Sequence, residues 1–330
     1  MGTYLTNSKM SPELRARIEA SVTGRRGPRG ALMTPRVRAL FQLVVVVVVA
    51  GAVAAFVHKW RQSTHELDLA KAALLADMDR LQTARPTRDQ PLVPAAERCL
   101  TEAAGTPGED QVDPSLREPA ALKAALERPL VYLRAPVSAV DVPSWLARLD
   151  PDPAMDAFVA CLMVPPAGRA EGDLVTQVEA AYRGGLDQAE ETARAYRLQI
   201  AVAAQPFFED SWHKLVNDAR TVSAVAELRQ AMEVAQLQRA TEVERAELLL
   251  YLLDEPKTPG SISELDGASA HVIRVGLFDL AASRPLLSLR REVDPQWISK
   301  AKRVYLARGL NACRLAYDLR EELRATGENR

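Results

Sequence analysis

The chain has 330 residues, of which 48% are hydrophobic and 26% charged, and its formal net charge is -1. This balance argues against wholesale disorder, and the low glycine and cysteine contents exclude collagen-like and disulfide-dense proteins. No motif identifies a reaction or a substrate, so function is inferred from the architecture.

Charge is divided unevenly along the chain. Residues 1–57 contain eight Lys or Arg and two Glu, which gives +6, so the remainder carries -7. A negative remainder is opposite to what the phosphates of nucleic acid attract, and we expect no nucleic-acid binding. Arginine outnumbers lysine by 34 to 8, a bias typical of a GC-rich bacterial genome. In such a cell the compartment outside the inner membrane is the periplasm.

The first 38 residues form a basic tail. Ser11-Pro12-Glu13 is typical of a helix start, and the apolar residues that follow four apart predict a short amphipathic helix. This helix either docks on a cytoplasmic partner or belongs to a tail that only fixes topology.

A membrane span follows the tail. Leu40 to Val57 is an 18-residue run whose only polar side chain is Gln42. A helix of that length rises about 27 Å, most of the roughly 30 Å hydrocarbon core of a bilayer. We therefore predict a transmembrane helix over residues 39–57, with Trp60 as an interfacial anchor in the lipid bilayer.

Flanking charge sets the orientation of the span. Five arginines precede the run within 20 residues and three basic residues follow it, so the N-terminus is expected in the cytoplasm and residues 58–330 outside. A cleaved signal peptide, with a start at Met33, is the alternative and also exports residues 58–330. A buried helix of a soluble protein is the third reading.

Residues 58–85 predict a helical stalk, and residues 86–93 predict a linker. Leu67, Leu74 and Leu81 are seven apart, which gives about two heptads. The stalk either self-associates through these leucines or continues as a single helix.

Residues 94–170 predict a subdomain of short helices with a strand at 130–133. Cys99 and Cys161 fall in two of the helices, and in an oxidising exterior they form a candidate disulfide. The alternative is three buried thiols, and Cys313 fits that description because it lies on an apolar helix face.

Residues 171–255 predict a large helical hairpin with arms over 173–204 and 211–253, the second arm being either continuous or interrupted near Ala235. The aromatic residues Phe207, Phe208 and Trp212 lie at the junction. They are either a partner-binding patch or the packing that closes the hairpin.

Residues 256–330 predict a loop, a β-hairpin over 271–280 and 286–293, and a final helix with Asp294 as its cap and Pro295 at its first position. The expected fold class is thus mainly α (α+β), with a single transmembrane helix, a stalk and an α-rich ectodomain.

The sequence assigns no catalytic, cofactor-binding or metal-binding residues. The four histidines have no ligand spacing, and adjacent carboxylates such as Asp254-Glu255 point about 100° apart on a helix. We expect an envelope protein whose ectodomain is a scaffold or protein-interaction module, more plausibly than an enzyme. The alternative is a membrane-anchored enzyme or sensor of cell-wall or small periplasmic ligands, indicated by a pocket with convergent carboxylates, His213 or His271.

Overall fold

The computed structural model describes residue 13 and residues 35–87, 91–105, 108–116, 118–140, 145–149, 153–193, 195–255 and 269–328. The chain divides into two compact units, residues 1–68 and 69–330. The predicted amphipathic helix of the tail, apart from residue 13, and the predicted loop after Glu255 lie outside the described residues.

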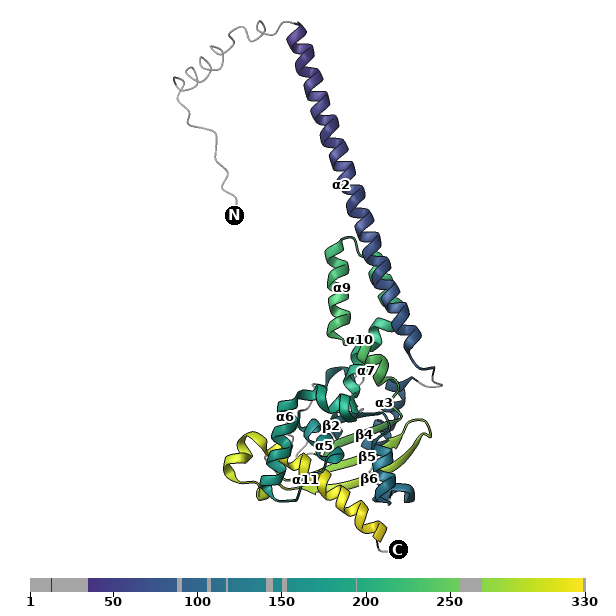
Figure 1. Ribbon diagram of the computed structural model, residues 1–330, viewed down its shortest axis with the longest axis vertical. Coiled ribbons are helices and arrows are strands. Elements are labelled where there is room, and N and C mark those ends of the chain that lie inside the picture. Colours follow the sequence, from purple (N-terminus) through teal and green to yellow (C-terminus); the bar gives the residue numbers. More distant parts are fainter. Residues whose placement is uncertain are drawn as a thin grey trace. The chain divides into compact units, whose positions relative to one another are not determined.

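The first unit contains most of a long helix, α2 (Pro35–Ala84) (Figure 1). Within the described ranges it is the single helix long and apolar enough to cross a membrane, and none of its most apolar 18-residue window is buried. No other described part of the chain covers the side chains of Leu40, Val57 and Trp60, all of which are exposed. An uncovered apolar surface of this length is suited to lipid, which agrees with the predicted span near the N-terminus.

The last part of α2, from Leu69, belongs to the second unit. Leu74 and Met78 have no exposed surface, and Asp77 forms an ion pair with Arg229 at 2.9 Å. The side chain of Leu74 is thus covered within the chain, and self-association through Leu67, Leu74 and Leu81 stays a prediction. Heptad spacing identifies an apolar face but not the partner that covers it.

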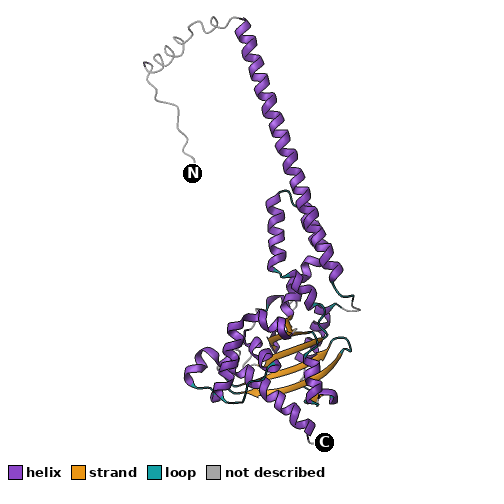
Figure 2. Cartoon of the chain, in the orientation of Figure 1, coloured by secondary structure: helices purple, strands orange, loops and turns teal. Residues whose placement is uncertain are grey.

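The second unit is built on one mixed six-stranded sheet in the order β1-β6-β5-β4-β2-β3 (Figure 2). β2 is parallel to β3 and β4, and the other neighbours are antiparallel. The strands are β1 (Gln111–Val112), β2 (Leu130–Pro136), β3 (Ala195–Arg197), β4 (Leu248–Glu255), β5 (His271–Asp279) and β6 (Arg284–Val293). Both edge strands are short, which limits pairing with other chains.

Helices cover both faces of this sheet, which places β2, β4 and β5 in the interior. The α-helices of this unit, besides the end of α2, are α3 (Leu92–Ala104), α4 (Pro119–Leu126), α5 (Pro153–Met163), α6 (Glu171–Ala193), α7 (Leu198–Ala204), α8 (Asp210–Asp218), α9 (Val222–Val234), α10 (Leu237–Val243) and α11 (Lys300–Glu328). Short 3-10 turns are η1 (Pro114–Leu116), η2 (Val137–Ala139), η3 (Leu146–Arg148), η4 (Gln205–Phe208) and η5 (Pro295–Trp297).

Alternation along β4 shows how the two faces are used. Leu248, Leu250 and Leu252 join the main core with residues of α5, α6 and α11. Tyr251 points to the other face, where α3 and α7 contact the sheet. It pairs across strands with Gly276, and a Cβ atom added to Gly276 would meet the tyrosine ring.

The predicted helical hairpin over residues 171–255 is wrong in both arms. Strand β3 divides the first arm into α6 and α7. The second arm forms α8, α9 and α10 and then strand β4, where the apolar run Leu248–Leu253 is buried on both faces. A continuous apolar run has no period that separates a buried strand from a buried helix. Gln236, with a left-handed backbone at φ 52°, separates α9 from α10.

The C-terminal part follows its prediction closely. β5 and β6 form the expected antiparallel hairpin. Asp294 caps the 3-10 turn η5, where its side chain accepts from the N–H of Gln296, and α11 begins only at Lys300. The fold is thus mixed α/β with a high helical content, and its sheet is larger than the sequence indicated.

The disulfide joins Cys161 of α5 to Cys313 of α11, with a Cα–Cα distance of 5.2 Å. The predicted Cys99–Cys161 pair is wrong because Cys99 lies in α3, which contacts the opposite face of the sheet from α5. Cys99 remains a buried thiol, and burial raises its pKa to about 12. A thiol with so high a pKa is inert as a nucleophile.

Candidate functional site

Three ionisable side chains meet inside the core at one end of the sheet and form what we call the charge cluster: Arg134 on β2, Asp254 on β4 and His271 on β5. The strand registers bring them together, because Asp254 pairs with Pro136 of β2 on one side and with Ile273 of β5 on the other. Side chains alternate along each strand, so all three point to the face covered by α5, α6 and α11.

The charge cluster consists of a bidentate ion pair between Arg134 and Asp254, with His271 in contact with the same carboxylate. Nε and Nη2 of Arg134 donate to Oδ2 and Oδ1 of Asp254, both at 2.8 Å. Nε2 of His271 lies 3.0 Å from the same Oδ1, and its Nδ1 lies 3.0 Å from the carbonyl oxygen of Ser269. Arg134 is 5% exposed and the other two are 1% exposed. Bidentate pairs of this kind are among the strongest hydrogen-bonded contacts in proteins.

Asp254 is held in its ionised form. Burial on its own would raise the pKa of the carboxyl group, since burial disfavours charge. The positive charge of Arg134 and the hydrogen bonds from Arg134 and His271 outweigh burial, and together they lower the pKa of Asp254 from 3.8 to about 2. The carboxylate therefore remains negative at every physiological pH.

This arrangement leaves the charge cluster little capacity for catalysis. Both ring nitrogens of His271 are already in contact with an acceptor, one with the carbonyl oxygen of Ser269 and the other with the carboxylate of Asp254. In the described part of the chain, neither nitrogen faces a space from which it could reach a substrate or a metal ion. Asp254 is too weak a base to take a proton near neutral pH. The charge cluster acts instead as a clamp across three strands.

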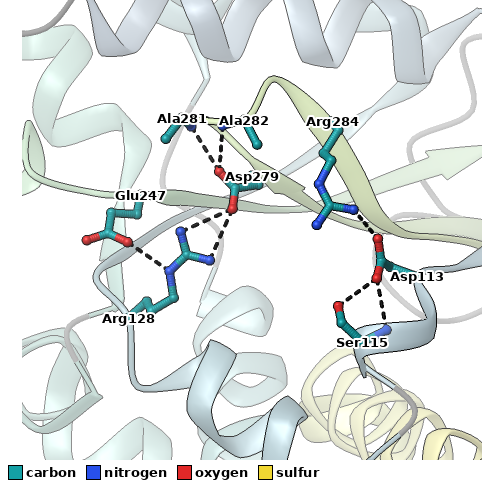
Figure 3. A network of polar contacts seen from close by, with 8 residues as sticks. All are labelled: Asp113, Ser115, Arg128, Glu247, Asp279, Ala281, Ala282 and Arg284. Atoms are coloured by element: carbon teal, nitrogen blue, oxygen red, sulfur yellow. Dashed lines mark hydrogen bonds and ion pairs between the residues drawn. The ribbon is translucent and has the colours of Figure 1, made fainter.

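A second polar network lies at the other end of β5 (Figure 3). Arg128 donates to Glu247 at 2.8 Å and to Asp279 at 3.1 Å. The second oxygen of Asp279 accepts from the backbone N–H groups of Ala281 and Ala282 in the turn between β5 and β6. Partial burial alone would raise the pKa of Asp279. The hydrogen bonds that its carboxylate accepts and the positive charge of Arg128 outweigh burial and lower this pKa. The network fixes the turn.

The edge strand β1 is attached through a separate group of polar contacts nearby (Figure 3). Asp113, which follows β1, binds Arg284 of β6 on one side and the hydroxyl and N–H of Ser115 on the other (Figure 3). Both polar networks thus have an architectural role.

The aromatic residues at the predicted hairpin junction are brought together as expected. The rings of Phe207 and Trp212 lie 4.4 Å apart, and the guanidinium of Arg85 lies 4.3 Å above the ring of Phe208. Trp212 is buried, whereas Phe207 and Phe208 are half-buried. Trp212 therefore serves in packing, and a role of the two phenylalanines in partner binding stays a prediction.

The sequence interpretation missed Arg134 and Asp254 as a pair. Each lies within or directly after an apolar strand segment, Leu130–Ala135 and Leu248–Leu253, where an isolated charge is costly unless it is paired. A single charged residue within or next to an apolar strand segment is therefore the sequence signal that identifies such residues. Their separation of 120 residues hides the partnership until the strands are aligned.

Among the described residues, no group of three His, Cys, Asp or Glu side chains is placed to hold a metal ion. No family model, curated protein or solved structure matches this chain. The arrangement of surfaces and side chains is therefore the basis for a functional proposal.

Proposed function

We propose that this protein is a single-pass membrane-anchored envelope protein whose exported domain binds another envelope protein. The exposed apolar surface of α2 and the arginines that precede it support an anchor with its N-terminus in the cytoplasm. The disulfide between Cys161 and Cys313 supports a domain in an oxidising compartment, since cytosolic thiols are kept reduced.

The observation that carries the interaction role is an apolar groove beside α9. The groove has a volume of about 500 Å³ and is bounded by α7, η4 and α9. The residues that line it are Ala203, Phe207, Glu227, Gln230, Ala231, Val234 and Ala235. We call this surface the α9 groove. It has the composition to receive an apolar side chain from a partner helix.

The packing of α9 supports this role. Val225 and Met232 are the two buried residues of the helix, whereas Val222 and Val234 at its ends are exposed. The ion pair between Arg229 and Asp77 adds a contact with α2. A helix that buries so little of its own apolar surface gains stability when a partner covers it.

The second proposal, an enzyme or sensor of small periplasmic ligands, is favoured by one observation, a polar pocket beside β6. His213 is half-buried on α8 and His271 belongs to the charge cluster, and neither lines any of the described pockets. The charge cluster does not favour an enzyme, because its groups are committed to one another.

Topology is tested with a reporter enzyme that is active only outside the cytoplasm, fused after Arg330. We expect activity in intact cells. An inactive fusion, with an active control fusion at a known exported protein, would overturn the proposed orientation.

The α9 groove is tested by placing a photoreactive amino acid at Gln230 and irradiating intact cells. We expect a discrete cross-linked adduct that disappears in the variant Val234→Asp. The matched control is Val304→Asp on α11, because Val234 and Val304 are similarly exposed, at 76% and 73%. An adduct that survives Val234→Asp, or that both variants remove equally, would contradict a role of this groove.

A further inference from the structure

A polar pocket of about 260 Å³ lies between the end of β6 and α11. Two arginines line it, Arg169 just before α6 and Arg314 on α11, and both face Asp318. Nη2 of Arg169 lies 2.8 Å from Oδ2 of Asp318, and Nε of Arg314 lies 3.7 Å from the same oxygen. One carboxylate oxygen shared by two guanidinium groups uses few of their N–H donors, so the pair retains the capacity to hold a second carboxylate.

Arg314 is held in position before any ligand arrives. Its guanidinium stacks 4.6 Å from the ring centre of Trp297, and the indole N–H donates to Oδ1 of Asn311 at 3.1 Å. Burial and the positive charge of Arg169 lower the pKa of Arg314, and Asp318 and Asp294 act in the other direction. Because the guanidinium of Arg314 is already stacked, it loses little freedom on binding an anion.

Negative groups also line the pocket. Glu292 belongs to the last residues of β6, and Asp294 follows the strand. Asp294 uses its Oδ1 to cap η5, which fixes its position. Two carboxylates beside two guanidinium groups repel a ligand of high negative charge, and they attract an ammonium group. The pocket thus presents side chains of both signs of charge.

We propose that this pocket binds a small zwitterion that carries a carboxylate and an ammonium group, the chemistry of a free amino acid. The ligand carboxylate binds between Arg169 and Arg314, and the ammonium group lies near Glu292 and Asp294. The volume is slightly below the roughly 300–1,000 Å³ of typical ligand pockets, which suits a molecule of this size. No residue of the α9 groove lines the pocket, so this proposal is independent of the interaction surface.

The test is calorimetric titration of the full chain in detergent micelles with three probes: glycine, acetate and inorganic phosphate. We expect glycine to bind more tightly than acetate, and acetate more tightly than phosphate. Arg169→Gln and Arg314→Gln should each weaken glycine binding by about 10- to 100-fold, the effect of one charged hydrogen-bonded contact. Arg324→Gln is the control, because Arg324 pairs with Glu321 one to two turns further along α11.

Thermal unfolding of each variant separates a binding defect from misfolding. Arg169 is more than half exposed, so Arg169→Gln should unfold at the temperature of the unmodified chain. Glu292→Gln should reduce the preference for glycine over acetate. The proposal fails if glycine does not bind, if phosphate binds more tightly than glycine, or if Arg324→Gln weakens glycine binding as much as Arg169→Gln does.

Discussion

The charge cluster gives the sharpest test of how this domain is held together, through the substitution Asp254→Asn. Asparagine preserves the shape of the side chain but removes its charge, which leaves the buried guanidinium of Arg134 without a counter-charge and removes the carboxylate that contacts His271. The lowered pKa of Asp254 alone corresponds to about 2 kcal/mol. Uncompensated burial of Arg134 adds to this, so we expect a total loss of about 3–5 kcal/mol.

The assay is thermal and denaturant unfolding of the full chain in detergent. A loss of that size lowers the unfolding temperature by roughly 6–20 °C for a domain of this size. The control is Glu321→Gln, which removes an exposed partner of Arg324 and should change stability by at most about 0.5 kcal/mol. Arg134→Met combined with Asp254→Leu should recover part of the loss. A loss below about 1 kcal/mol for Asp254→Asn would refute the reasoning.

Acid unfolding follows from the same residue. The pKa of Asp254 is lower in the folded chain than its ordinary value of 3.8, so its contribution is fully present above that value. The contribution is lost as the pH falls from about 4 to about 2, where the folded state must also take up the proton. Stability measured over this interval should fall more steeply in the unmodified chain than in Asp254→Asn. Equal slopes would show that Asp254 is not the group responsible.

Two further predictions concern packing and covalent structure. Gly276→Ala should cost about 1–3 kcal/mol in unfolding measurements, because the added methyl group meets the ring of Tyr251, whereas Gly172→Ala, with open space around it, should be neutral or slightly stabilising. Replacing Cys161 and Cys313 by serine, or reducing their disulfide, should cost about 2–5 kcal/mol, and an unchanged unfolding midpoint after reduction would contradict a structural role of the bond.

Sequence alone predicted the elements that carry local signals. The long α2 follows from an uninterrupted apolar run, and the β5–β6 hairpin follows from alternation around a short turn. The break at Gln236 lies next to the interruption near Ala235 that the sequence offered, although its left-handed backbone is uncommon for a glutamine. Strand β4 was missed because Leu248–Leu253 is apolar on both faces.

The partners in the disulfide and in the charge cluster could be identified only once the order and register of the strands were known. The sequence offered Cys99 as the partner of Cys161 and treated Cys313 as a buried thiol, and only the layer order shows that Cys313 shares the face of Cys161 while Cys99 does not. The charge cluster likewise requires the register of β4 with both β2 and β5. The disulfide and the Arg134–Asp254 pair join residues more than 100 positions apart, and spacing along the chain says little about such contacts.

The pairing of β1 with β6 has a consequence for biosynthesis. Val112 pairs with Leu287, so the edge strand β1 is synthesised long before its partner β6. Strand β2 is likewise synthesised well before its partner β4. A ribosome adds residues one at a time, and such long-range contacts close late and slowly. The sheet is therefore completed only after β6 has been synthesised, and until then its apolar strands lack their partners.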